Sequence, residues 1–132
     1  MTEAPWLSVV MPARNGARWI GRTLGSVLAQ RADAAGIECI LVDGSDDAAT
    51  IESARAAAGP LDLRIHARPD LGSWQAKTNW GVAQARAAHV SALHVDDLWL
   101  PGRAAAVRRW IAAAPSAALH LNPSRIIDAE DR

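Results

Sequence analysis

Apolar residues in this chain alternate between short compact runs and longer stretches in which they recur at every third or fourth position. The short runs are typical of buried strands, and they lie at Trp6–Met11, Ile37–Val42, Leu61–His66 and His89–Val95. The longer stretches have helical spacing, and they lie at Ala17–Gln30, Ala48–Ala58, Trp74–Ala88 and Pro101–Ala114. Two further short strand candidates follow, Ala117–Leu121 and Arg125–Ile127.

Strands and helices in alternation predict an α/β fold, in which a mostly parallel sheet is flanked by helices. We expect Pro12 to end the first strand, and Asp46 or Asp47 to cap the helix that begins at Ala48. The first, second and fourth strands should be parallel neighbours. The loops that follow them should therefore meet at one edge of the sheet.

The composition is that of an ordinary globular domain. A chain of 132 residues and 14.0 kDa allows one domain, and 50% apolar with 21% charged residues argues against disorder. Fourteen basic and fourteen acidic side chains cancel to a formal charge of zero. A broad electrostatic surface for nucleic acid is therefore not expected, and nucleic acid is not a predicted partner.

The sequence contains few signals that indicate where in the cell the protein is located. No apolar run approaches the ~20 residues of a membrane span, and the N-terminus, Met1–Pro5, lacks the pattern of a signal peptide. The single cysteine, Cys39, cannot form an internal disulfide, and its place in an apolar strand predicts a core residue. These features favour a cytoplasmic protein, with the inner face of a membrane as the alternative.

The residues that follow the predicted strands carry the candidate chemistry. In open parallel sheets, ligands bind beyond the carboxyl ends of the strands. Pro12–Asn15 follows the first strand, Asp43–Asp47 follows the second, and Asp96 and Asp97 follow the fourth. Mg²⁺ and Mn²⁺ take carboxylate oxygens and bridge to phosphates, so acidic residues at two strand ends suggest a cation or donor site.

Several common nucleotide and catalytic motifs are missing from the sequence. It has no Gly-x-x-x-x-Gly-Lys-Ser/Thr loop and no Gly-x-Gly-x-x-Gly after the first strand, which weighs against P-loop and dinucleotide-binding domains. It also has no cysteine pair, His-x-x-x-His or Gly-x-Ser-x-Gly. A receiver-like signalling domain would need an acidic pair where Pro12–Arg14 stands.

Four blocks, each at an expected strand end, resemble the family 2 glycosyltransferases. Val9–Gly16 (VVMPARNG) resembles their V-V-x-P-x-x-N opening, and Leu41–Thr50 (LVDGSDDAAT) resembles V-D-G-S-x-x-x-x-T. Leu71–Gly81 (LGSWQAKTNWG) is similar to x-G-x-x-x-A-x-N-x-G with one extra residue, and Leu93–Pro101 (LHVDDLWLP) to L-D-A-D-D-x-x-x-P. The resemblance covers residues 6 to 112 approximately.

The resemblance implies a GT-A fold that binds a nucleotide diphosphate sugar. Residues 1–132 are then expected to be one nucleotide-sugar-binding domain, with the acceptor-binding half and the catalytic base beyond Arg132. The resemblance implies that Asp96 and His94 bind Mg²⁺ or Mn²⁺. His94 occupies the position of the first aspartate in the family's D-x-D motif. The residues implied for nucleotide binding are Pro12, Ala13, Arg14, Asn15, Asp43, Gly72, Lys77 and Asp97.

Most of these residues have a structural alternative. Asp43 suits an Asx-type turn before Gly44, and Asp96 suits a cap for the helix after Pro101. Asn15 suits a loop position, and Lys77, the only lysine, suits a solvated helix face. His94 would then only hydrogen-bond Asp96. The tryptophans Trp74, Trp80 and Trp99 fit either the mouth of a pocket or the core.

The implied function is transfer of a sugar, with inversion and metal assistance, from a nucleotide diphosphate donor to an acceptor. UDP or GDP is the expected nucleotide, and the acceptor is a saccharide, a lipid-linked saccharide or a protein. The alternative is a non-catalytic nucleotide-binding or interaction module of the same fold. A sheet face left exposed without the second half would favour a homodimer.

Overall fold

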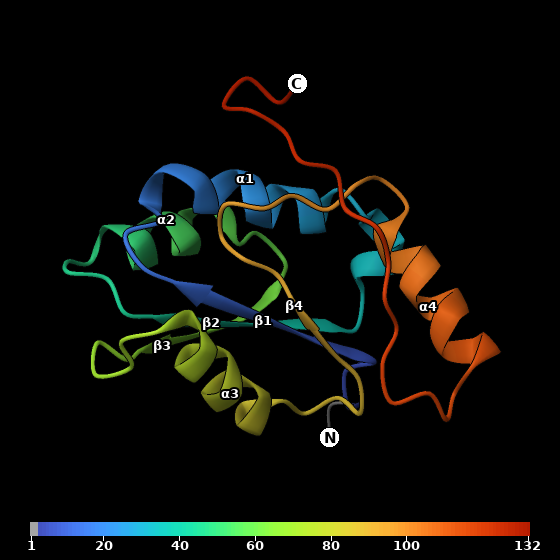
Figure 1. Cartoon of the computed structure of the whole chain (residues 1–132). Helices are drawn as coiled ribbons and strands as arrows, with labels where there is room; N and C mark the ends of the chain where they lie inside the picture. Colours follow the sequence, from blue (N-terminus) through green and yellow to red (C-terminus); the bar gives the residue numbers. More distant parts are fainter. Residues whose placement is uncertain (1–2) are drawn as a thin grey trace.

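The computed structural model describes residues 3–132 and contains one four-stranded parallel sheet with the strand order β3-β2-β1-β4 (Figure 1). The strands are β1 (Leu7–Ala13), β2 (Ile37–Asp43), β3 (Asp62–Ala67) and β4 (Val90–Ala92). The two central strands, β1 and β2, are buried at every position. Strands covered on both faces read as continuous apolar runs, which is the pattern of these two segments.

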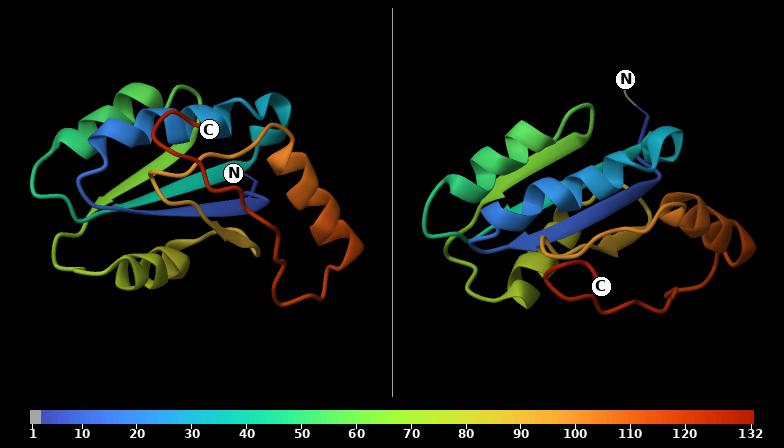
Figure 2. Two further views of the ribbon diagram at one scale, coloured as in Figure 1. Left: turned by 45° about the horizontal axis from the view of Figure 1, so that its top comes forward. Right: turned by 90° about the horizontal axis from the view of Figure 1, so that it is seen from above.

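Helices cover both faces of this sheet (Figure 1 and Figure 2). One face carries α1 (Ala17–Leu28) and α2 (Ala49–Ala57), and the other carries α3 (Trp74–Gln84). A short 3₁₀ turn, η1 (Arg31–Ala34), follows α1, and α4 (Arg103–Ala113) lies at the end of the sheet where β1 begins. Across residues 3–132, no helix combines the length and the apolar character that crossing a bilayer requires.

The core forms mainly between α1 and the central strands. Ile20, Leu24 and Val27 lie on one face of α1 and are fully buried in the same cluster as Val9 and Met11. Complete burial of such a side chain contributes roughly 1.5–3 kcal/mol relative to leaving it exposed. The helical spacing read from the sequence therefore marks the face that holds α1 on the sheet.

The predicted order of elements is confirmed from β1 to α4, and β1, β2 and β4 are parallel neighbours as predicted. The expected end of the first strand at Pro12 is wrong, because β1 continues to Ala13. The amide of Ser8 and the carbonyl of Val10 bond toward β4, so Pro12 faces the same side, beyond the last residue of that strand. No ladder partner is present there, and the missing proline N–H costs nothing.

Boundaries elsewhere shift by a few residues. The helix expected to run to Ala88 ends at Gln84, and the fourth strand shortens to Val90–Ala92. Neither aspartate proposed as the cap of α2 is its N-cap residue, which is Ala48, although the Asp47 carboxylate accepts the N–H of Ala49 at 3.0 Å.

The two strand candidates after α4, Ala117–Leu121 and Arg125–Ile127, are wrong. The chain there is extended without helix or strand and runs back past α1 to the C-terminus (Figure 1). Leu119 and Leu121 alternate as a strand would, yet they are 71% and 85% exposed. Alternation specifies a strand only when a partner receives the backbone hydrogen bonds, and this segment pairs with no strand of the described chain.

Candidate functional site

A pocket of about 320 Å³ opens at the carboxyl ends of β1 and β4, beside the first turn of α3. Eight of its lining residues were predicted from the sequence: Pro12, Ala13, Arg14, Asn15, Gly72, Lys77, His94 and Asp96. Trp74 was a candidate for either the pocket mouth or the core, and three others were not predicted, namely Gly16, Trp19 and Val95. The fold therefore gathers segments that are up to 84 residues apart in the sequence, as residue numbers 12 and 96 show.

The wall formed by the β1–α1 loop is fixed to the β2–α2 loop. The amide of Asn15 donates to Ser45 Oγ (2.8 Å), its Nδ2 donates to Asp46 Oδ2 (2.8 Å), and its Oδ1 accepts from Asp46 N (3.1 Å). Asn15 has a positive φ of 49°, which asparagine tolerates. Arg14 donates to Asp46 Oδ1 at 3.3 Å, and the Asn15 hydrogen bond followed by the Arg14 charge lowers the pKa of Asp46. Both ends of the Asn15 amide thus hold the two loops together, and its contact with a nucleotide stays a prediction.

Asp43 ends β2 below this wall and is buried, but it does not line the pocket. Its Oδ1 accepts from Ser45 Oγ at 2.5 Å and from Ser45 N at 3.3 Å. The structure therefore contains the Asx-type turn that the sequence offered as an alternative. A contact between Asp43 and a nucleoside stays a prediction.

Lys77 lies on α3 and is only 3% exposed, so the alternative of a solvated helix face is wrong. A Cβ atom added at Gly44 would lie 2.5 Å from Lys77 Cε, so the lysine stem needs glycine at that position. None of the ion pairs within the described chain involves Lys77. The pocket wall thus contains a lysine whose side chain is almost entirely enclosed and whose ammonium group has no acidic partner among the described residues.

The segment after β4 brings His94 and Asp96 to the pocket. Thr23 of α1 anchors it, because its hydroxyl donates to the Val95 carbonyl at 2.6 Å. Asp96 is exposed, and it does not cap α4, whose N-cap residue Gly102 has no side-chain bond. Asp97 is exposed and lies outside the pocket lining.

A divalent cation fits these residues only as part of a shared site. In the described part of the chain, no group of three or more His, Cys, Asp or Glu side chains is arranged to hold a metal ion. Asp96 and His94 are the candidate protein donors at the pocket. Mg²⁺ is commonly held by one or two carboxylates together with substrate phosphates and water. The donor set therefore suits a cation that binds with a phosphate ligand.

Aromatic side chains shape the mouth of the pocket. Trp74 is 54% exposed, and its ring lies 5.3 Å from the His94 ring at 57°. Trp19 of α1 lines the opposite wall and was missed, because its helical spacing reads as core. Of the other two tryptophans singled out from the sequence, Trp99 is in the core, and Trp80 packs away from the pocket against His66. The sequence could not separate these roles without the packing.

Comparisons with known proteins agree on the family. The chain matches the family model of Glycosyl transferase family 2 over residues 8–131. An uncharacterized glycosyltransferase of Rickettsia bellii is 30% identical over 103 residues, which are 77% of this chain and 14% of that protein.

Two solved structures have the same fold. S. aureus TarS is similar with a TM-score of 0.74 and 22% identity, over 83% of this chain and 20% of TarS. The mannosyltransferase PcManGT from Pyrobaculum calidifontis, solved with GDP-Man and Mn²⁺, has a TM-score of 0.62 and 27% identity, over 84% of this chain and 33% of that one. This chain thus spans a third or less of the length of these relatives. Its α/β sheet is of the GT-A glycosyltransferase type, and the chain belongs to glycosyl transferase family 2.

Proposed function

We propose that the pocket binds the nucleoside diphosphate of a sugar donor, and that the protein transfers this sugar to an acceptor hydroxyl. Residues 1–132 act in this proposal as one nucleotide-sugar-binding domain. The observation that carries it is the combination, in one pocket, of the largely enclosed Lys77 with exposed Asp96 and half-buried His94. The Lys77 ammonium group has no acidic partner among the described residues, and an anionic ligand in the pocket would supply one.

The backbone at the start of α1 supports a phosphate site of this kind. In dinucleotide-binding folds, free N–H groups at a helix N-terminus hold the phosphates. Here the N–H of Asn15 donates to Ser45 Oγ at 2.8 Å, and the N–H of Gly16 donates to Thr50 Oγ1 at 3.0 Å. These two donors are already used, so neither is free for a phosphate. We assign the diphosphate to Lys77 and to a cation.

Asp96 and His94 are the residues that would hold such a cation, Mg²⁺ or Mn²⁺. A diphosphate and the Asp96 carboxylate repel each other unless a positive charge lies between them. When bound, the cation supplies positive charge to the departing diphosphate. The structure of PcManGT with GDP-Man and Mn²⁺ supports this proposal by similarity.

The nucleoside is assigned to the walls formed by Trp74 and by the β1–α1 loop. The exposed indole of Trp74 offers an apolar face for a base, and Arg14, whose side chain is 60% exposed, can stack in the same way. Asp43 provides a carboxylate near this wall for a base N–H or a ribose hydroxyl. TarS residues 1–349, solved with UDP-GlcNAc, and PcManGT with GDP-Man support UDP or GDP as the nucleotide.

The proposed reaction is a displacement at C1 of the sugar, with inversion. The acceptor oxygen forms a bond to C1 as the bond from C1 to the diphosphate oxygen breaks. The diphosphate leaves with that electron pair, and a carboxylate base takes the proton of the acceptor hydroxyl. No residue of the pocket is assigned as this base.

Calorimetric titration tests the proposal. We expect UDP or GDP to bind in the presence of Mg²⁺ or Mn²⁺ and much more weakly without them, and NAD not to bind. Lys77→Met should weaken nucleotide binding by about a hundredfold or more, because it removes a buried charge that the ligand needs. Arg109→Met is the matched control, since it removes one positive charge from the exposed face of α4. Tight binding of NAD alone, or unchanged binding by Lys77→Met, contradicts the proposal.

A non-catalytic nucleotide-binding module is the second candidate function. It is favoured by His94 at the usual place of an acidic ligand and by the small donor set for a metal. Incubation with UDP- and GDP-sugars separates the two functions. Slow release of free sugar from the donor supports the enzyme, whereas binding without hydrolysis or transfer supports the module.

A further inference from the structure

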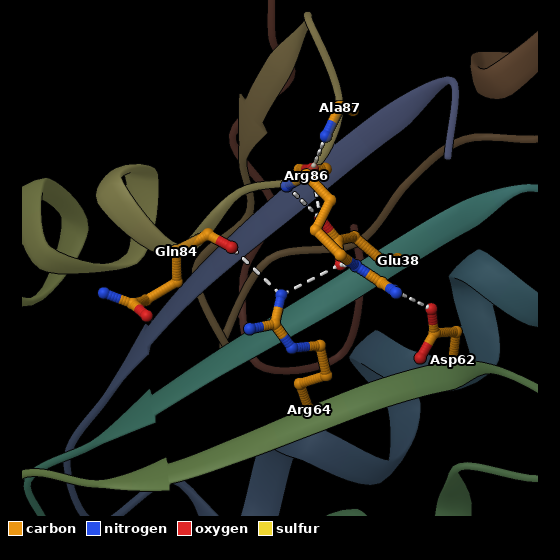
Figure 3. A network of polar contacts seen from close by, with 7 residues as sticks. Glu38, Asp62, Arg64, Gln84, Arg86 and Ala87 are labelled. Carbon is orange, nitrogen blue, oxygen red and sulfur yellow. Dashed lines mark hydrogen bonds and ion pairs between the residues drawn. The ribbon is translucent and has the colours of Figure 1, made fainter. Parts of the chain in front are cut away.

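A cluster of charged side chains surrounds buried Glu38 near the starts of the strands, at the opposite end of the sheet from the pocket. Figure 3 shows this cluster from close by. Glu38 of β2 is fully buried, and its carboxylate accepts from Ser8 Oγ (2.5 Å), Arg86 N (2.7 Å), Arg86 Nε (2.7 Å) and Arg64 Nη1 (3.1 Å). Arg86 also pairs with Asp62. We call Ser8, Glu38, Asp62, Arg64 and Arg86 the Glu38 clasp. It contains two cations and two anions, so its charges balance.

The Glu38 clasp holds the C-terminal end of α3. Arg64 Nη1 donates to the carbonyl of Gln84, the last residue of α3, at 3.0 Å, and to Glu38 as well. Arg86 follows that helix by two residues and bonds Glu38 through its backbone and its side chain. The next residue, Ala87, donates its N–H to Ser8 Oγ at 3.1 Å. Side chains from three strands thus fix the point at which the chain leaves α3, as Figure 3 shows.

Apolar packing contributes little to the position of α3. Only Lys77 and Gly81 are buried on this helix, whereas Trp74 and Val82 are 54% and 45% exposed. A Cβ atom at Gly81 would lie 2.5 Å from Val10 Cγ1, so the helix approaches the sheet closely but presents no large side chain to it. No row of buried leucine, isoleucine or valine holds α3 as one holds α1. Its placement therefore depends on its ends.

The other end of α3 forms part of the pocket. Trp74 and Lys77 lie in its first turn and line the pocket wall. Lys77 precedes Gln84 by seven residues, which corresponds to roughly 10 Å along a helix. The two ends of α3 are thus joined by one continuous helix of 11 residues, with the Glu38 clasp at one end and Lys77 at the other.

We propose that Glu38 is a positioning residue for nucleotide binding: it holds α3 so that Lys77 lies in the pocket, and this sets the affinity for the nucleoside diphosphate. The effect on affinity rests on the proposed function, whereas the effect on Lys77 does not. The alternative is that the Glu38 clasp contributes only to global stability.

The test compares Glu38→Gln with Val27→Ala, which removes buried volume from α1 on the other face of the sheet. Gln keeps the size of the side chain but loses the charge that the two arginines need. Both variants are measured at a temperature at which each is as fully folded as the parent. The first readout is the rate at which an amine-specific reagent labels Lys77, the only lysine, with peptide mass spectrometry to separate it from the α-amino group. The second is the Kd of UDP or GDP, whichever the parent binds more tightly.

We expect Glu38→Gln to speed the labelling of Lys77 by about tenfold and to raise the nucleotide Kd by a similar factor, as expected for coupled positions. Val27→Ala should change neither. Labelling and Kd at the parental values in Glu38→Gln, or equal changes in Val27→Ala, overturn the proposal. Faster labelling with an unchanged Kd overturns the effect on affinity.

Two further measurements distinguish failure of this proposal from failure of a variant to fold and from failure of the proposed function. If Glu38→Gln does not fold, Arg86→Lys takes its place. It keeps the backbone bond to Glu38 and a positive charge, and it should produce a smaller change of the same sign. If the parent binds no nucleotide, the proposed function fails, and the labelling rates still decide whether Glu38 positions Lys77.

Discussion

The two ends of the sheet differ in whether their enclosed charged side chains are paired. At the amino end, Glu38 is fully buried, and each charge of the Glu38 clasp has a partner within 3.1 Å. At the carboxyl end, Lys77 is 3% exposed but forms no ion pair with the described residues, and Asp96 is exposed in the same pocket. Enclosed charges are normally paired, so a charge without a partner is a candidate place for a ligand. We propose that the first end stabilises the fold and that the second binds the nucleotide.

Removal of Glu38 should have the largest effect on stability. Glu38→Ala leaves Arg64 and Arg86 without the carboxylate that they share. These arginines are 30% and 45% exposed, so water replaces part of the lost interaction, and we expect a loss of about 3 kcal/mol of unfolding free energy, at the lower end of the range for a buried pair. Chemical denaturation measures this loss. A loss below ~1 kcal/mol would mean that the Glu38 clasp behaves like an ordinary surface ion pair.

Acid should remove nearly as much stability through the same residue. Burial raises the pKa of Glu38, but the hydrogen bonds from Ser8, Arg86 and Arg64 outweigh it and lower the pKa from 4.5 to about 2. The folded state therefore binds the proton less readily than the unfolded state. The stabilisation, about 3 kcal/mol, is present above pH ~4.5 and is lost as the pH falls toward ~2.

Denaturation between pH 5 and 2 checks this prediction, with Glu38→Gln as the control. That variant should lose less stability over the same interval. Exposed carboxylates with lowered pKa values, such as Asp46 and Asp70, contribute equally to the two proteins. Parallel curves for parent and variant would show that Glu38 is not the group that titrates.

Lys77→Met should have a smaller effect on stability, of the opposite sign. Methionine fills a similar volume without an ammonium group that must be buried, so unfolding free energy should stay within ~1 kcal/mol of the parent or rise. Thermal unfolding without ligand provides the measurement. A loss of several kcal/mol would show that Lys77 is a structural residue and that the two ends of the sheet do not differ.

Asp96→Asn should change stability least, by less than ~1 kcal/mol, because the side chain is exposed. It should still remove metal-dependent nucleotide binding. His94→Ala should weaken binding with Mn²⁺ more than with Mg²⁺ if the imidazole is a ligand, and both equally if it only supports Asp96. Titrations with each metal decide. Parental binding by Asp96→Asn would show that the cation site lies elsewhere.

Local patterns in the sequence were enough to predict much of the fold and several pocket residues. Apolar runs and helical spacing predicted the order of elements from β1 to α4, because they reflect burial along short segments. Polar residues after strands predicted that Pro12–Asn15 and Asp96 come together, because parallel strands end at one edge, and the family resemblance added His94. Predictions failed where they needed a partner, as for Ala117–Leu121, which alternates like a strand but has no neighbouring strand.

Burial of charged residues depended on contacts between distant segments. Glu38 is a single acidic residue in an apolar strand, and its partners Arg64 and Arg86 are 26 and 48 residues away in the sequence. Lys77 reads as a solvated residue until α3 is placed, because its burial depends on the close approach to Gly44. Asn15 joins two loops that are 31 residues apart.

The sequence by itself determined the α/β order, the family resemblance and the strand ends at which polar residues cluster. Each of these depends only on residues that are close together in the sequence. Only the tertiary structure decided which charges are paired. Hydrophobic periodicity is a property of one segment, whereas the satisfaction of a buried charge is a property of all the segments that meet around it. For this reason the Glu38 clasp, and the lack of an ion pair for Lys77 among residues 3–132, became visible only in the folded chain.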